Sequence, residues 1–326
     1  MHPFLIKRYA EKTALWTGLG ALNAPLAFLP AMLAGQITYH HSTQSPEHAL
    51  RSAIQLGGFK PLESTSPLAL MANEMGKEVG VTFTHLYKTD EKCFENIMIL
   101  QDRRDEAALL FQGDPLQDLD LIEAGQEQQF LRGILAHELG HTHTRGTNYF
   151  QHTATITSHL YGFGAGVSMC IGWAMMLFGS FTTGLGFMGA AAAGATASIA
   201  TLVLRSRNLK NDEYLADIHG AQIFGADDLI ITHDFADRVL GPQIEQAKSA
   251  YKGHDTPGLM TRLYDNFIDA THPSSRDRTN ALRRIFKSNA AFNLAGEPVL
   301  QERFAPSQKS IRLYATRIEP KNNKPQ

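Results

Sequence analysis

The sequence is poor in cysteine and has no marked excess of charge of either sign. The chain of 326 residues holds 2 cysteines, Cys93 and Cys170, which are far apart in the sequence. A disulfide framework is therefore excluded as the basis of the fold, and the cysteines do not set the compartment. The formal net charge is -2, so there is no electrostatic footprint for nucleic acid and no nucleic-acid partner is expected.

A long internal stretch also lacks charged side chains. Residues 146–204 contain no Asp, Glu, Lys or Arg. The part from 160 to 204 is about twice as long as one membrane span, which predicts an apolar helical hairpin over 159–204 that turns near 179–184. Small side chains at 189–194 allow two such helices to pack closely in a bilayer. The alternative is a hairpin buried inside a soluble protein.

The N-terminal segment is basic at residues 7–12 and then uncharged from 13 to 39. It fits a signal peptide, a single span or a kinked, re-entrant anchor, and we expect membrane association of one of these kinds. A second basic segment, 205–210, follows the hairpin. The positive-inside rule places both basic segments in the cytoplasm, which requires an even number of crossings between them.

Between these regions, residues 42–126 have the composition of a soluble domain. Helices are predicted at 45–55 and from the Ser66-Pro67 cap to residue 77. Short strands are predicted at 81–87, 96–100 and 107–112, which gives a small sheet. The last strand is our candidate for an edge strand that holds an extended substrate by main-chain hydrogen bonds.

Residues 131–145, LRGILAHELGHTHTR, carry the strongest chemical signal. On a helix, His137 and His141 lie four residues apart on one face and can share a metal ion, for which zinc is the natural candidate. Glu138 is rotated off that axis and suits a general base that takes a proton from water. Gly140 is costly in a helix interior, which suggests a close approach to its backbone. His143 is expected to point away from the metal.

A second acidic pair follows the hairpin, in the segment NDEYLADIHGA at 211–221. Glu213 and Asp217 share a helix face. A two-histidine zinc site with an open fourth position requires one more protein ligand, and Glu213 is the candidate. Asp217 is placed to accept the second ring N–H of a liganding histidine and so fix its tautomer.

The remaining sequence is predicted to be helical at 226–239, 242–250, 258–270 and 274–287. His272 and Pro273 lie at the start of the last helix, a position suited to projecting into a cleft. The polar end, residues 315–326, is expected to be disordered.

Together these segments resemble a known family. HELGH, an apolar helical pair, E-Y-x-A-D, and T-H-P followed by Arg278 and Leu282 are similar to the membrane zinc metallopeptidases that include HtpX, the CAAX prenyl protease and the Oma-type peptidases. The resemblance implies one zinc ion on His137, His141 and Glu213, with Glu138 as the base. It also implies that His272 and Arg278 stabilise the transition state and that Asp217 supports a ligand.

The expected fold is mainly α with a small β-sheet (α+β), a gluzincin-type metallopeptidase domain interrupted by the hairpin. We expect an N-terminal membrane-associated segment at 1–42, the first part of the peptidase domain at 43–158 and a transmembrane hairpin at 159–204. The second part of the domain would occupy 205–314, before the tail at 315–326.

The expected function is membrane-bound zinc endopeptidase activity on protein or peptide substrates, with membrane protein quality control as one role. The location would be a bacterial inner membrane or an organelle membrane, with several crossings and the lipid bilayer as a partner. Two alternatives stand beside it: a non-catalytic or chaperone-like membrane adaptor with a structural or vestigial zinc site, and a soluble zinc peptidase with a buried hairpin.

Overall fold

A computed structural model gives the fold, and it describes residues 2–23, 59–89, 96–101, 106–112, 125–144, 147–240 and 273–292. The helices predicted at 45–55, 242–250 and 258–270, together with the tail, lie outside these residues. The described chain divides into two compact units. The first holds α1 (Pro3–Asn23), α6 (Thr147–Leu177) and α7 (Phe181–Phe224) as far as Glu213. The second holds the sheet and the other helices, with α7 from Tyr214 onward.

The sheet of the second unit has four strands, β1 (Lys60–Pro61), β2 (Thr82–Thr89), β3 (Asn96–Gln101) and β4 (Glu106–Gln112). Their order is β1-β2-β4-β3, in which β2 and β4 are parallel and the other pairs antiparallel. The three predicted strands are confirmed. Strand β4 pairs with β2 on one side and with β3 on the other, so its backbone groups are used by both ladders. The expectation that residues 107–112 form the edge strand is wrong, and among the described strands β3 lies at that end of the sheet.

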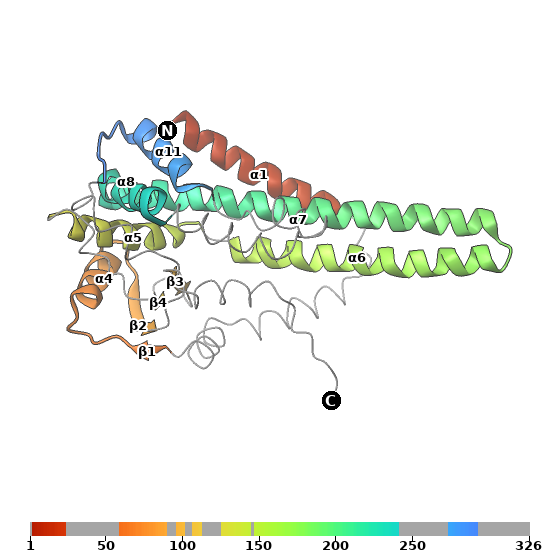
Figure 1. Cartoon of the computed structure of the whole chain (residues 1–326), viewed down its shortest axis with the longest axis horizontal. Helices are drawn as coiled ribbons and strands as arrows, with labels where there is room; N and C mark the ends of the chain where they lie inside the picture. Colours follow the sequence, from red (N-terminus) through yellow and green to blue (C-terminus); the bar gives the residue numbers. More distant parts are fainter. Residues whose placement is uncertain are drawn as a thin grey trace. The chain divides into compact units, whose positions relative to one another are not determined.

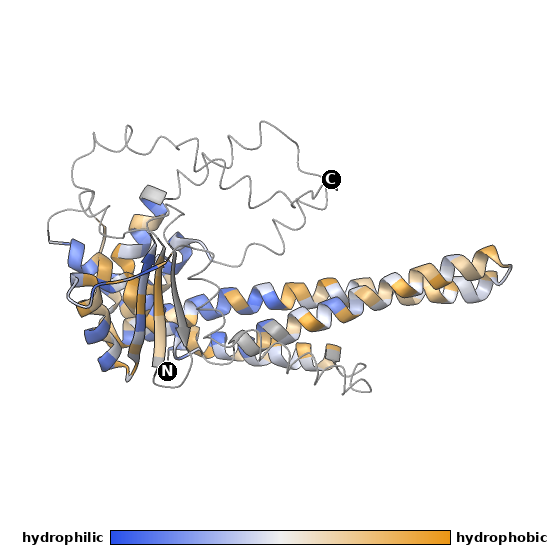
Figure 2. Cartoon of the chain, turned by 90° about the horizontal axis from the view of Figure 1, so that it is seen from below, coloured by the Kyte–Doolittle hydropathy of each residue, from blue (hydrophilic) through white to orange (hydrophobic). Residues whose placement is uncertain are grey.

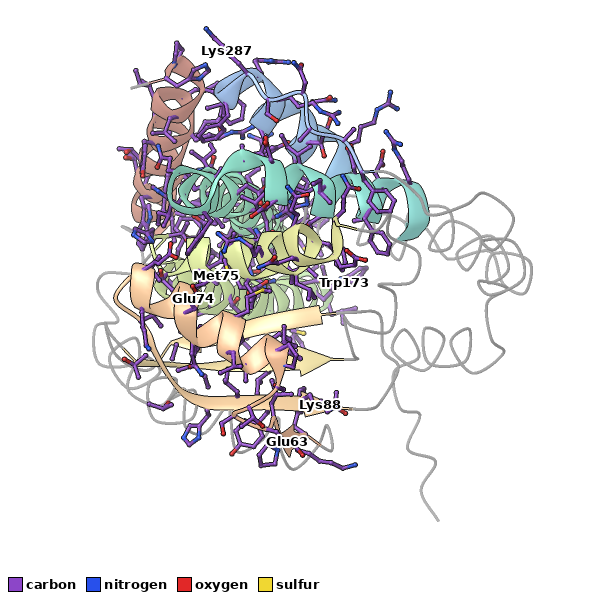
Figure 3. The ribbon with its side chains drawn as sticks, turned by 90° about the vertical axis from the view of Figure 1, so that its left-hand side faces the viewer. Glu63, Glu74, Met75, Lys88, Trp173 and Lys287 are labelled. Atoms are coloured by element: carbon purple, nitrogen blue, oxygen red, sulfur yellow. The ribbon has the colours of Figure 1, made fainter. Side chains whose placement is uncertain are left out.

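Helices cover one face of this sheet (Figure 3). Helix α4 (Pro67–Glu78) starts as predicted, since the Ser66 hydroxyl accepts a hydrogen bond from the Ala69 N–H at 3.2 Å. Alternate residues of a strand point to opposite faces, so β4 is buried on both. Leu109 and Phe111 pack with α4 and α5 (Glu127–His141), while Leu110 packs with Phe59.

The second unit also holds three further described elements: α8 (Ala226–Phe235), the π-helix η3 (Ala236–Leu240) and α11 (Ser275–Phe286). Helix α8 packs against α5 and α11. The Arg283 guanidinium donates to the Asp234 carboxylate at 2.7 Å, which ties α11 to α8. Helix α11 begins one residue later than predicted, because Ser274 is its N-cap and Pro273 precedes the cap.

In the first unit, α6 and α7 form the hairpin (Figure 1). The turn at residues 178–180 contains Gly179, whose φ of 87° favours glycine. The helices approach closely where a Cβ on Gly184 would lie 2.8 Å from the Gly172 carbonyl oxygen. The predicted hairpin is present, but α6 already starts at Thr147 and α7 runs without a break through the acidic pair.

The hairpin is apolar along most of its length (Figure 2). The segment Thr153–Leu177 and helix α7 are both long and apolar enough to cross a membrane. Only 6% and 11% of their most apolar windows are buried. Large side chains on the outside include Phe163, Trp173, Leu177 and Phe178.

Helix α1 packs along the base of this hairpin. Leu15 and Leu19 are buried with Phe150 and Ala154 of α6, and Leu204 of α7 packs against them. The Asn211 side chain donates to the Arg8 carbonyl at 3.0 Å. The basic start of α1 and the basic segment at 205–210 therefore lie at the same end of the hairpin.

Candidate metal centre

The candidate metal-binding motif lies on α5, whose apolar face fixes its position. Phe130, Leu135 and Leu139 are almost fully buried in the core of the second unit. His137 and His141 lie on the remaining, partly exposed face. The 3.6-residue period of the helix thus separates the residues that anchor α5 from those that carry the chemistry.

Glycines allow α5 and α7 to pack backbone to backbone. A Cβ on Gly140 would lie 2.0 Å from the Ala216 carbonyl oxygen. A Cβ on Gly220 would lie 2.4 Å from the Ala136 carbonyl oxygen. Both distances are far inside van der Waals contact, so neither position accepts a larger residue without moving a helix. The close approach predicted at Gly140 is confirmed, and it brings the segment after Glu213 beside the histidines.

Three side chains form the group that could hold a metal ion: His137, His141 and Glu213, whose ligand atoms all lie within 4.8 Å of one another. The Nε2 atoms of the two histidines are 3.3 Å apart. Two nitrogens bound at 2.0–2.1 Å to one tetrahedral zinc ion are about 3.3–3.4 Å apart, so this spacing fits zinc. The donor set of two imidazoles and one carboxylate also leaves a fourth position for water or substrate.

Asp217, one helical turn after Glu213, supports this group. Its Oδ1 lies 2.9 Å from His137 Nδ1, within hydrogen-bond distance. With its proton on Nδ1, the His137 ring keeps the Nε2 lone pair for a metal. The carboxylate is 1% exposed, and burial of this kind restricts the ring to one orientation. The contact expected between Asp217 and a histidine of the motif is present.

Arg278 binds the same carboxylate from the first turns of α11. Its Nε donates to Asp217 Oδ2 and its Nη2 to Oδ1, both at 2.7 Å. This is the two-point geometry in which guanidinium and carboxylate bind most strongly. Nη2 also lies 2.8 Å from His137 Nδ1, because both groups converge on Oδ1. Arg278 is thus brought beside the predicted ligands, where it holds Asp217.

A residue that the sequence did not indicate completes this network. His233 of α8 is 5% exposed, and its Nε2 lies 2.9 Å from Asp217 Oδ1. In the sequence it stands between Thr232 and Asp234, directly after the apolar residues 229–231. No spacing to another chemically active residue distinguished His233 from an ordinary core histidine.

The network shifts the pKa values of its own members. Burial alone would raise the pKa of Asp217, but the charge of Arg278, the charge of His233 and the hydrogen bonds from Arg278 and His137 hold it well below its usual value. Burial lowers the pKa of His233, and the nearby Arg278 charge lowers it further. The lowered pKa favours the ionised form of the Asp217 carboxyl.

Glu138 and His272 are the two remaining predicted site residues, and only Glu138 lies among the described residues. Glu138 is partly buried, and its Oε1 lies 3.9 Å from His137 Nε2. It is therefore beside the face on which the ligand atoms meet. His272 lies outside the described residues.

His143 takes no part in the metal group. Its ring stacks on that of His219, with centroids 5.4 Å apart and an interplanar angle of 26°. His143 is therefore not one of the three residues in the candidate metal group, which are His137, His141 and Glu213.

Comparison with known proteins identifies the family. The family model described as "Peptidase family M48" matches residues 118–286, just over half of the chain. No solved structure matches. The matched stretch includes the motif of α5, the hairpin, the acidic pair of α7 and Arg278, so the resemblance inferred from these motifs is confirmed. The chain belongs to peptidase family M48, a family of metal-dependent peptidases.

Proposed function

We propose that the protein is a zinc endopeptidase of the gluzincin type, anchored in a membrane by its hairpin. The observation that carries this proposal is the convergence of His137, His141 and Glu213, with Asp217 fixing the first of them. When bound, zinc polarises the scissile carbonyl and lowers the pKa of water towards 7.

The protein groups then move the proton. Glu138 takes it from the attacking water and later passes it to the leaving amine, as a general base and acid. Arg278 acts mainly through Asp217, to which it is bound at two points. The roles of Arg278 and His272 as donors to the developing oxyanion stay predictions from the family resemblance.

The open edge of the sheet offers a place for substrate. Within the residues that the structure describes, strand β3 pairs with β4 on one side only, and α5 contacts it. An extended peptide that adds to β3 by main-chain hydrogen bonds would be held independently of its side chains. The substrates proposed are therefore proteins with extended segments, including membrane proteins that need quality control.

We propose that the domain boundaries predicted from the sequence hold for the protein. Residues 43–158 and 205–314 form the peptidase domain, and 159–204 is the membrane hairpin. The low burial of the apolar windows of α6 and α7 favours a lipid environment over the soluble alternative. Extraction of membranes with carbonate tests this point, because release of the protein into the supernatant would support the soluble form.

The main experiment measures zinc content and casein cleavage on protein purified in detergent. Wild type should hold one equivalent of zinc and cleave casein. Glu138→Gln should keep the zinc and lose cleavage by several orders of magnitude, because the metal ligands are intact and the base is gone. Glu213→Ala and His137→Ala should lose both. Cleavage at the wild-type rate by Glu138→Gln would refute the mechanism.

The adaptor alternative makes a different prediction for the same samples. A closed structural site needs four protein ligands, usually with cysteine. Within the described chain the metal group has three ligands and no cysteine. Zinc in wild type, without cleavage of casein or any other protein offered, would favour this alternative.

A further inference from the structure

We propose that Lys12 of the N-terminal helix is a positioning residue for the metal centre, acting through Asp212 on the third ligand, Glu213. This inference rests on the proposed zinc site. It assigns to α1 a part in metal binding besides its packing on the hairpin.

The contact that carries the inference is a buried ion pair. Lys12 Nζ lies 2.7 Å from Asp212 Oδ1, and the two side chains are 14% and 2% exposed. The other carboxylate oxygen, Oδ2, accepts from Asn208 Nδ2 at 2.7 Å. Asn208 lies one turn earlier on α7 and is fully buried. Both oxygens of Asp212 are thus bound away from water.

The neighbouring residue adds a second attachment between the same helices. Asn211 is 2% exposed, and its side chain donates to the Arg8 carbonyl of α1 at 3.0 Å. Residues 211 and 212, directly before Glu213, are therefore both bound to α1. Because α7 is one continuous helix, a rotation or shift at residue 212 is passed to residue 213.

Removal of the Lys12 ammonium would change this turn. A buried carboxylate that loses an ammonium at 2.7 Å is strongly destabilised unless it reaches water or is neutralised. Movement of Asp212 towards water turns the adjacent Glu213 away from His137 and His141. A site whose third ligand is displaced binds zinc more weakly, in the manner of sites that lose a supporting contact.

The experiment measures the zinc dissociation constant of full-length protein in detergent by competition with a chromophoric chelator. Circular dichroism and the melting temperature of the zinc-free protein are recorded alongside. Lys12→Met should weaken zinc binding roughly 10-fold or more. Lys12→Met combined with Asp212→Asn should recover most of the affinity, since no buried charge is left. Lys7→Met is the matched control, because Lys7 lies on the same helix with its side chain 70% exposed, and it should bind zinc as wild type does.

The outcomes separate this inference from the proposed function. If wild type binds no zinc, the proposed site itself is wrong. If wild type and Lys12→Met bind zinc equally, and only the melting temperature falls, Lys12 serves packing alone and the inference is overturned. Should Lys12→Met not fold, Lys12→Gln takes its place with the same expectation, as it keeps a donor but removes the charge.

Discussion

Asp217 receives hydrogen bonds from three elements of the second unit. His137 of α5, His233 of α8 and Arg278 of α11 all reach its carboxylate at 2.7–2.9 Å. A buried carboxylate with this many donors is stable only in its ionised form. The residue therefore contacts a proposed metal ligand and at the same time joins three helices to α7.

Asp217→Asn tests this double role. The amide has nearly the same shape, but it presents an N–H to a site filled with donors and leaves the Arg278 charge without its partner. We expect a loss of about 3–5 kcal/mol in the free energy of unfolding, as for other broken buried ion pairs. We also expect roughly 10- to 100-fold weaker zinc binding. Denaturant unfolding and chelator competition measure the two effects.

Asp237→Asn provides the control for this change, because Asp237 is exposed on η3. It should alter neither quantity. Wild-type zinc affinity in folded Asp217→Asn would mean that the His137 tautomer does not depend on the carboxylate.

At the residue scale, the site residues predicted from the sequence are those whose partner lies within about one helical turn. His137 and His141 follow from the helical period, and Glu213 with Asp217 from the next acidic pair. His233 and Lys12 were not predicted. Their partners lie 16 and 200 positions away in the chain, and no local periodicity reports a contact of that kind.

At the scale of elements, α5 is held by glycines at two interfaces. Gly140 faces the Ala216 carbonyl of α7, and Gly133 faces the Asp228 carbonyl of α8, where a Cβ would lie 2.2 Å away. Thr232 of α8 adds a hydrogen bond to the Phe130 carbonyl at 2.9 Å. Backbone contact on two sides leaves α5 little freedom to rotate, which keeps the histidine pair in register with the acidic pair.

Gly140→Ala should therefore act on the site without removing a ligand. The added methyl would force α5 and α7 apart, which we expect to cost about 1–3 kcal/mol or more of unfolding free energy, and to weaken zinc binding. Thermal unfolding with and without zinc measures both.

Gly20→Ala gives the comparison for this substitution. Gly20 is also helical, but a Cβ there meets nothing within 4 Å. That variant should be neutral or more stable, by up to about 1 kcal/mol. Equal effects of the two substitutions would contradict the close-packing argument.

The helices and strands themselves were largely predictable from the sequence, but the pairing partners of the strands were not. The Ser66 cap, the three longer strands and the α5 helix follow from local signals. The strand order β1-β2-β4-β3 does not follow from local signals. Strand β3 lies between β2 and β4 in the sequence, but β2 and β4 pair directly with each other, and among the described strands β3 lies at the end of the sheet. Pairing across that distance depends on tertiary packing, so the edge was assigned to the wrong strand.

At the scale of the whole molecule, two tryptophans report on the proposed membrane hairpin. The chain holds only Trp16 and Trp173. Trp173 lies on α6 near the turn and is 56% exposed, whereas Trp16 packs against Phe150 at a centroid distance of 4.9 Å. Trp16→Phe leaves Trp173 as the single reporter.

In vesicles, this variant should show blue-shifted emission that lipids brominated on their acyl chains quench strongly. The reason is that the apolar length of the hairpin places Trp173 among those chains. Trp173→Phe, which retains only Trp16, should be quenched less by the same lipids. Strong quenching of Trp173 by aqueous iodide would instead place it in water and argue against a membrane hairpin.

The uninterrupted run of α7 from the hairpin to the acidic pair also bears on how the protein is made. A ribosome synthesises the histidines of α5 first, then the whole apolar hairpin, and only afterwards Glu213 and Asp217. The metal group is incomplete until the hairpin has left the ribosome. A nascent chain of this design has no finished site with which to cut itself or its neighbours, and its activity begins only when synthesis has passed the segment proposed to insert in the bilayer.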